Sequence, residues 1–303
     1  LLLCSIAAVV LVGTLYPMFA DLMLKEKYSV GPPFFNTAIL PLAAPLIGAM
    51  GFGPMLAWKR ARLFPALQRL WWAALAGLGA LALCLMLEGQ RVGPALGFGA
   101  AAWIIAAALA DIADRIALFS RPRAAWGRAM GLPRAAWGGA VAHAGMGVMI
   151  LGLAGMGLAV DKLQLVKPGE STQLAGLDYK LVGVTDATGP NFTARRATVE
   201  VHDGIRLVTV LAPEKRSFPV GRMTTTEAAI HTTWLKDLYI VLGDEREGGA
   251  VLRIHNNPLA PWIWLGAAIM ALGGGVSLSD RRMRVSAPAA KRVKGDPQGR
   301  ARA

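Results

Sequence analysis

The sequence predicts a polytopic α-helical membrane protein with about six transmembrane helices and an all-β outer-side domain inserted before the last helix. Of its 303 residues, 54% are hydrophobic and 17% are charged, and the mean hydropathy of +0.45 is too high for one soluble domain. Long apolar runs alternate with short polar connections. Between residues 161 and 257 the pattern changes to short segments that alternate apolar and polar residues.

Six apolar runs are long enough to cross a bilayer, which takes roughly 20 helical residues. The fourth is the weakest, because Asp111, Asp114 and Arg115 shorten its uncharged part. In the last run, Trp262 and Trp264 are typical of interfacial anchors. The six predicted spans are residues 1–19, 37–58, 70–87, 94–119, 138–160 and 258–278.

The first run begins at Leu1 without a methionine, a basic leader or a small-residue cleavage site. We therefore interpret it as a transmembrane helix of a chain fragment and not as a signal peptide. Turn-forming residues at Gly31, Pro32 and Pro33 predict an outer loop before the second span. The arginine-rich connection at residues 120–137 is predicted to be an inner loop.

The net charge of +13 is concentrated in alternate connections. Residues 161–257 contain 12 basic and 12 acidic side chains and are neutral. The excess lies in residues 59–69, 115–134 and 281–302, which the positive-inside rule assigns to the cytoplasm. This distribution predicts a periplasmic β domain and a cytoplasmic C-terminus, and it argues against a nucleic acid as a partner.

These observations divide the chain into four parts. Residues 1–160 form a transmembrane region with five spans, and residues 161–257 form the β domain. Residues 258–280 form the final transmembrane helix, and residues 281–303 form a basic cytoplasmic tail predicted to be disordered. About seven or eight strands are expected in the β domain, as a small sandwich or barrel.

Several common sites are not predicted. Cys4 and Cys84 lie in separate apolar runs, and no CxxC occurs, so a zinc site or a thiol redox site is not expected. Pairs of the Gly-x-Gly type lie inside apolar helices and not at a strand-to-helix turn, which excludes a dinucleotide site. No Ser-His-Asp order or phosphate-binding loop occurs, which argues against a self-contained hydrolase.

His143 is the main candidate for function, because it is the one histidine within a long apolar run. An imidazole without a partner is costly in hydrocarbon. Gly139 and Gly147, four residues to either side, leave its helix face nearly bare. Three interpretations remain open: an axial ligand of a flat macrocycle, a helix-packing face with a hydrogen bond to a neighbouring helix, and a proton relay.

Other polar residues give weaker indications. His202, His231 and His255 lie on predicted strands, and their irregular spacing gives no metal signature. Asp111 and Arg115 are four residues apart, so they are expected to meet on one helix face where a helix emerges at the inner surface.

Six dispersed stretches carry a family resemblance: LVGTLYP, YSVGPPFFNTAILPL, VAHAGMGVMILG, PEKRSFPVGRMTTTEAAI, DLYIVLGD and NPLAPWIWLGAAIMALGGGVSLSDRR. In order and topology they resemble the C-terminal half of the bacterial CcmF family, which acts in cytochrome c-type biogenesis. The resemblance covers nearly all of the chain.

This resemblance implies a membrane subunit of a cytochrome c haem lyase in the bacterial inner membrane. It implies that His143 is an axial iron ligand of a haem b, with Gly139 and Gly147 giving clearance on the haem face. It further implies haem transfer from the chaperone CcmE to apocytochrome c, beside CcmH/CcmI-type subunits. The segment at residues 213–230 would be a mixed-charge loop that docks such partners.

The family's tryptophan-rich loop, its two flanking histidines and the second haem b ligand have no counterpart in this chain. The resemblance therefore implies that this fragment alone is not catalytic. Two other hypotheses are a membrane transporter, in which His143 relays protons or contacts substrate, and a structural scaffold for assembly subunits. A transporter would show inverted repeats and broken helices near the midplane, and the sequence shows no repeat.

Overall fold

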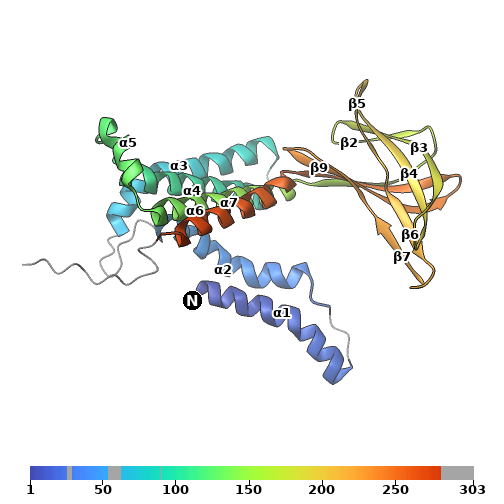
Figure 1. Cartoon of the computed structure of the whole chain (residues 1–303), viewed down its shortest axis with the longest axis horizontal. Coiled ribbons are helices and arrows are strands. Elements are labelled where there is room, and N and C mark those ends of the chain that lie inside the picture. The colour runs from blue at the N-terminus through green and yellow to red at the C-terminus, as the bar shows by residue number, and fades with distance from the viewer. Residues whose placement is uncertain (26–28, 54–62, 90, 281–303) are drawn as a thin grey trace, which may run out of the picture.

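The computed structural model describes residues 1–25, 29–53, 63–89 and 91–280. Within these ranges, six helices are long and apolar enough to cross a membrane (Figure 1). Together with a β domain between the last two of them, they confirm the predicted fold class. These helices are α1 (Leu2–Leu24), α2 (Pro32–Phe52), α3 (Leu63–Leu87), α4 (Val92–Arg115), α6 (Arg134–Met156) and α7 (Ala260–Leu278). The predicted end of the second span at Trp58, most of its basic connection and the tail at residues 281–303 lie outside the described residues.

Some helix ends differ from the prediction. Helix α2 starts at Pro32 and not at residue 37, because prolines fit the first turn of a helix, where the backbone N–H groups have no intrahelical partner. Helix α4 ends at Arg115 and not at residue 119, and Ala117 beyond it adopts a positive φ of 52°. Helix α6 begins at Arg134, directly after Pro133.

The arginine-rich connection is not a loop as predicted, because most of it forms helix α5 (Pro122–Gly131). Pro122 occupies the first turn, and alanines, which are the best helix formers, fill the next positions. The dense positive charge obscured this propensity. In Figure 1, α5 lies at the end of the helical region that is far from the β domain.

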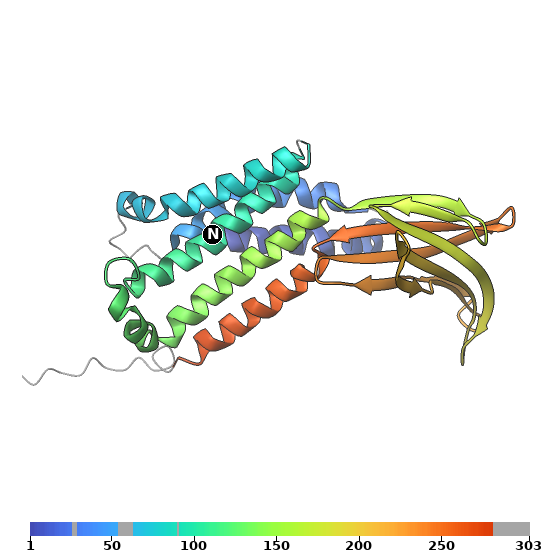
Figure 2. The same ribbon diagram turned by 90° about the horizontal axis from the view of Figure 1, so that it is seen from above.

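The β domain is a sandwich of two antiparallel sheets (Figures 1 and 2). One sheet has the order β1-β10-β9-β8, and the other has the order β2-β3-β4-β6-β7 with β5 also paired to β4. The strands are β1 (Val160–Val166), β2 (Ser171–Leu174), β3 (Leu177–Thr188), β4 (Thr193–Asp203), β5 (Arg206–Leu211), β6 (Glu214–Phe218), β7 (Met223–Glu227), β8 (Ala229–Thr232), β9 (Lys236–Arg246) and β10 (Gly249–Pro258).

The described residues therefore contain ten strands, more than the seven or eight that the pattern predicted. The additional strands are short and lack a long apolar alternation. In particular, residues 213–230 do not form the predicted loop, because β6 and β7 pair as a hairpin with Glu214 opposite Glu227. The sandwich core contains Tyr179, Leu181, Val199, Ile240 and Ile254, which are fully buried between the sheets.

Glycines allow α6 and α7 to approach each other closely. Gly138, Gly145 and Gly152 are seven residues apart on α6 and face α7. A Cβ atom on Gly145 would lie 2.7 Å from the backbone nitrogen of Met270, and a Cβ on Gly273 would lie 2.5 Å from that of Ala142. Backbone atoms cannot move aside as a flexible side chain can, so only glycine fits at these positions.

The β domain is connected directly to this helix pair through its first and last strands. Strand β1 follows α6, strand β10 precedes α7, and the two strands pair in antiparallel register from Val160 opposite Asn256 to Val166 opposite Ala250. Figure 2 shows the two helices running side by side into the sheet. Because both connections leave the helices at the same place, the sandwich is attached through two adjacent strands.

A buried carboxylate links two strands of the second sheet. Glu214 on β6 is 7% exposed and accepts hydrogen bonds from Arg216 at 2.8 Å and from Arg196 on β4. The Arg216 guanidinium also lies 4.5 Å from the centre of the Phe192 ring, at the distance of a cation–π contact. The hydrogen bonds from Arg216 and Arg196 hold the pKa of Glu214 below its ordinary value of 4.5.

We predict that Gly266→Ala destabilises the helical region, because the added methyl group would collide with the backbone of Met149. Overpacking of this kind costs about 1–3 kcal/mol. The matched control is Gly274→Ala, since a Cβ there meets open space. Thermal unfolding in detergent should show a lower midpoint for Gly266→Ala than for wild type. The midpoint of the Gly274→Ala control should not be lowered. Equal midpoints would contradict the packing argument.

We predict that Glu214→Gln lowers the free energy of unfolding by about 1–3 kcal/mol at pH 7, because it weakens two charged hydrogen bonds. A lowered pKa in the folded state means that the stabilisation is complete above pH 4.5 and is lost as the pH falls through the folded-state pKa. Unfolding measured at pH 7 and at a pH below the folded-state pKa of Glu214 should therefore show the full gap between wild type and variant at pH 7 and a much smaller gap at the lower pH. Glu247→Gln, on an exposed turn, is the control.

Candidate functional site

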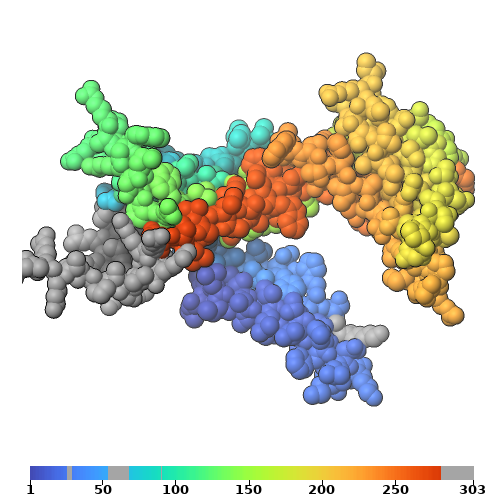
Figure 3. Space-filling view, in the orientation of Figure 1, coloured from blue at the N-terminus to red at the C-terminus, as the bar shows by residue number. Residues whose placement is uncertain are grey.

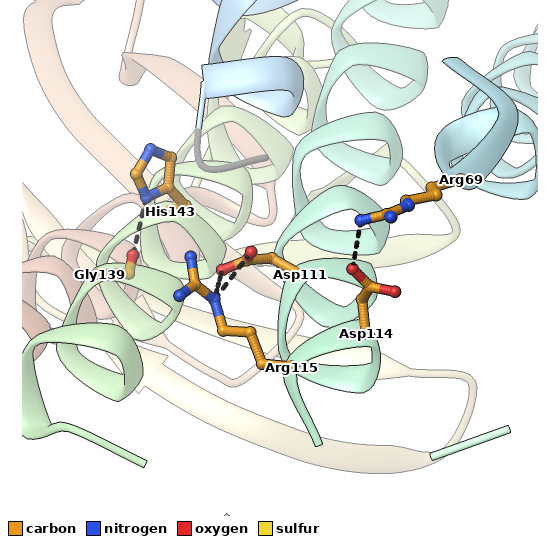
Figure 4. Close-up of polar contacts among 6 residues, drawn as sticks. All are labelled: Arg69, Asp111, Asp114, Arg115, Gly139 and His143. Atoms are coloured by element: carbon orange, nitrogen blue, oxygen red, sulfur yellow. Dashed lines mark hydrogen bonds and ion pairs between the residues drawn. The ribbon is translucent and has the colours of Figure 1, made fainter. Parts of the chain in front are cut away.

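His143 lies near the middle of α6, and its ring is partly buried. Its Nδ1 atom lies 2.7 Å from the carbonyl oxygen of Gly139, one turn earlier on the same helix (Figure 4). A carbonyl oxygen only accepts hydrogen bonds, so the proton of the neutral ring is on Nδ1. This contact satisfies one ring nitrogen within α6 and does not require a neighbouring helix.

The hydrogen bond has a chemical consequence for the other ring nitrogen. With the proton on Nδ1, the lone pair of Nε2 is free to bind a metal ion or accept a proton. Backbone carbonyls commonly fix metal-binding histidines in this way, since they orient the ring and select its tautomer. The Nε2 atom of His143 can therefore act as a metal ligand. The packing interpretation, in which the ring would bond across to another helix, gains no support from this contact.

The two glycines beside His143 have different surroundings. A Cβ atom on Gly139 would meet no atom of the described residues within 4 Å, so this side of the helix is open toward them. A Cβ on Gly147 would lie 2.5 Å from Cγ1 of Ile105 and 3.1 Å from the carbonyl oxygen of Ala101. Gly147 therefore contacts α4, and free space next to the histidine is found on the Gly139 side.

Polar contacts gather at the end of the bundle far from the β domain. Asp111 and Arg115 pair at 2.9 Å on α4, as their spacing predicted, and the Asp111 side chain is 10% exposed (Figure 4). Arg69 of α3 binds Asp114 of α4 at 2.7 Å. Asp280, just after α7, accepts a hydrogen bond from the backbone of Ala135 in the first turn of α6.

The alignment of α4 with α6 shows how far the Asp111–Arg115 ion pair lies from His143 along the helix axis. Helices α4 and α6 run antiparallel, with Gly97 beside Ala154 and Gly147 beside Ala101 and Ile105. Continuing this register toward the polar end brings Asp111 to the level of Gly139. The ion pair thus lies about one helical turn from the level of His143.

The other histidines do not join this site. His202 lies on β4, His231 on β8, and His255 on β10, where its ring packs edge-on against Tyr239. Among the described residues, no group of three or more His, Cys, Asp or Glu side chains is arranged to hold a metal ion.

Sequence reasoning missed two contacts near this site. The capping of α6 by Asp280 joins residues 145 positions apart, and no local pattern marks it. The pair of Arg69 with Asp114 likewise joins two helices. A lone acidic residue after the last apolar run was the one available signal for the first contact, since acidic groups favour helix N-termini.

Comparisons with known proteins decide the family. Residues 157–258 match the family model described as the CcmF C-terminal beta-sandwich. The cytochrome c-type biogenesis protein ccl1 of Rhodobacter capsulatus is 42% identical over 308 residues, which cover 97% of this chain and 45% of that protein. CcmF of Escherichia coli is 34% identical over 291 residues, which cover 93% and 43%. The chain belongs to the CcmF-type cytochrome c biogenesis proteins.

A solved structure supports the fold of this CcmF-type chain. The structure called Cytochrome c Heme Lyase CcmF matches with a TM-score of 0.71 and 24% sequence identity, over 92% of this chain and 44% of that one. The CcmF-type chain thus spans somewhat less than half the length of the relatives it matches.

Proposed function

We propose that this chain is part of a cytochrome c haem lyase of the bacterial inner membrane and that His143 is an axial ligand of a haem b. The observation that carries the proposal is the His143 Nδ1 contact with the Gly139 carbonyl, which leaves Nε2 available inside a membrane helix. The names of the relatives support the reaction class, since they are cytochrome c-type biogenesis proteins.

The residues around His143 fit a flat macrocycle. The open space at Gly139 allows a planar group to approach the helix that carries the ligand. The neighbouring apolar residues would exclude water, and both conditions tune the potential of a bound iron. When bound, a haem b would supply one-electron chemistry at this place. The chain itself supplies Nε2 for binding and the Gly139 carbonyl for orientation, while Gly147 keeps α4 packed against the same helix.

A second imidazole ligand would come from outside this chain. The three remaining histidines lie on strands of the β domain. From His143 to the end of α6 at Met156 the helix rises about 20 Å, at 1.5 Å per residue. No strand histidine can bridge that distance to a shared iron. The relatives are more than twice as long as their matched part, and the proposal assigns the second ligand to their unmatched part.

The proposed topology follows the distribution of charge. The basic connections are assigned to the cytoplasm and the neutral β domain to the periplasm. In that orientation, the sandwich could receive the haem chaperone CcmE, CcmH/CcmI-type subunits and apocytochrome c, which are partners that the family resemblance implies. The β6–β7 hairpin replaces the predicted docking loop as the mixed-charge surface of this domain.

The transporter hypothesis has less support than haem binding. It expects broken helices near the midplane around the functional residue. Helix α6 runs without a break from Arg134 to Met156, and His143 lies in its interior. The scaffold hypothesis expects His143 to be replaceable, which the following experiment tests.

We predict that His143→Ala in the full-length protein abolishes b-type haem binding. Losing even an indirect contact to a metal ligand costs about 10–100-fold in affinity, so losing the ligand itself should cost at least that much. The measurement is the reduced-minus-oxidised absorbance spectrum of the purified protein. His202→Ala, on a strand of the β domain, is the control and should keep the haem.

The outcome separates the hypotheses. Unchanged b-type absorbance in His143→Ala would contradict the proposal that His143 is a haem ligand. Full cytochrome c maturation with His143→Gln would favour the scaffold. Thermal unfolding of each variant checks that the helices remain folded, because the His143 ring contacts its own helix and its removal should leave the midpoint nearly unchanged.

A further inference from the structure

The short turn between β8 and β9 is closed by internal hydrogen bonds and lies against the start of α7. Thr233 closes it, since its backbone N–H and its hydroxyl both donate to the Lys236 carbonyl, at 2.9 and 2.8 Å. The Lys236 N–H donates back to the Thr233 hydroxyl at 3.1 Å. The tip between these two residues is Trp234 and Leu235.

Two hydrogen bonds attach this tip to the final transmembrane helix. The backbone N–H of Leu259, at the N-cap of α7, donates to the Leu235 carbonyl at 2.7 Å. The indole N–H of Trp262 donates to the Trp234 carbonyl, also at 2.7 Å. The backbone carbonyls of the tip are therefore satisfied by protein groups, as a segment entering a low-dielectric region requires.

The side chains of the tip remain exposed although they are large and apolar. Trp234 is 77% exposed and Leu235 is 67% exposed, and Trp264 on the first turns of α7 is 78% exposed. In Figures 1 and 3 this part of the β domain lies where the sandwich meets the helices, beside α7. Three exposed apolar side chains thus lie at the level where the sheet meets the membrane helix.

The length of α7 sets the depth of the turn. Its 19 residues span about 28 Å at 1.5 Å each, close to the thickness of roughly 30 Å of the bilayer hydrocarbon. The start of α7 is therefore at the hydrocarbon boundary, and a turn bonded to Leu259 and Trp262 lies at the same level. Tryptophan is enriched at this level because its ring is apolar and its N–H is polar.

We propose that the β8–β9 turn inserts Trp234 and Leu235 into the lipid headgroup region and so holds the β domain against the membrane surface. The occupant of this apolar surface is the phospholipid bilayer, since the turn is hydrogen-bonded to the start of α7, a helix long and apolar enough to cross the membrane. Two other exposed apolar residues of the domain, Ile205 on the β4–β5 turn and Val220 on the β6–β7 turn, make no hydrogen bond to a membrane helix within the described part of the chain. The inference is independent of haem binding.

The test is the lipid exposure of single cysteines in the full chain. After Cys4 and Cys84 are replaced by serine, Trp234→Cys and Leu235→Cys are labelled with a nitroxide and reconstituted in phosphatidylethanolamine–phosphatidylglycerol vesicles. Collision with oxygen, which partitions into lipid, is compared with collision with a water-soluble nickel chelate. Leu272→Cys in the middle of α7 is the lipid control, and Ile205→Cys is the water control.

The expected result is that the ratio of oxygen to nickel collisions at positions 234 and 235 lies several-fold above that of Ile205→Cys, toward the value of Leu272→Cys. A ratio equal to that of Ile205→Cys would overturn the proposal, because the turn would then stand in water. Low collision with both reagents would also overturn it, since the turn would then be covered by protein. The four positions changed to cysteine are exposed. Cys84 is buried, so thermal unfolding of the cysteine-free protein checks that the fold is retained before labelling.

Discussion

The close approach of α6 and α7 is the constraint on which the rest of the structure depends. At Gly138, Gly145 and Gly152 on α6, and at Gly266 and Gly273 on α7, a Cβ atom would meet backbone atoms of the opposite helix. In a bilayer, apolar burial does not drive helices together, so the small residues that permit backbone contact define the pair. The β domain is inserted between these two helices, and its first and last strands simply continue their pairing.

This packing also determines which side of α6 His143 occupies. One side of α6 faces α7 through three glycines spaced seven residues apart, and a second side faces α4 through Gly147 and Ala154. The side with Gly139 and His143 remains, and there a Cβ on Gly139 would meet open space. A histidine on a helix held on two sides has little freedom to move, and the Gly139 carbonyl fixes its ring. Such preorganisation suits a metal ligand better than a mobile proton carrier.

The two ends of the bundle differ in chemistry. The end far from the β domain holds the ion pairs of Arg69 with Asp114 and of Asp111 with Arg115. The other end holds exposed tryptophans and the β8–β9 turn bonded to α7. The ion-pair end also carries exposed tryptophans, Trp71 on α3 and Trp126 on α5. Aromatic side chains at both ends therefore favour a fixed position of the helices along the membrane normal.

The sequence by itself determined the membrane helices, the change to a β domain and the place of His143, because these depend on local hydropathy and on periods of 3.6 and 2 residues. It also predicted the pair of Asp111 with Arg115, which is one helical turn apart. It missed helix α5 and the β6–β7 hairpin, where charge masked the local propensity. Only the tertiary structure decided that Gly139 faces open space while Gly147 faces α4, that Asp280 caps α6, and that the β8–β9 turn lies on α7. These features join residues distant in the chain, and no local pattern records which neighbour a helix face or a turn will meet.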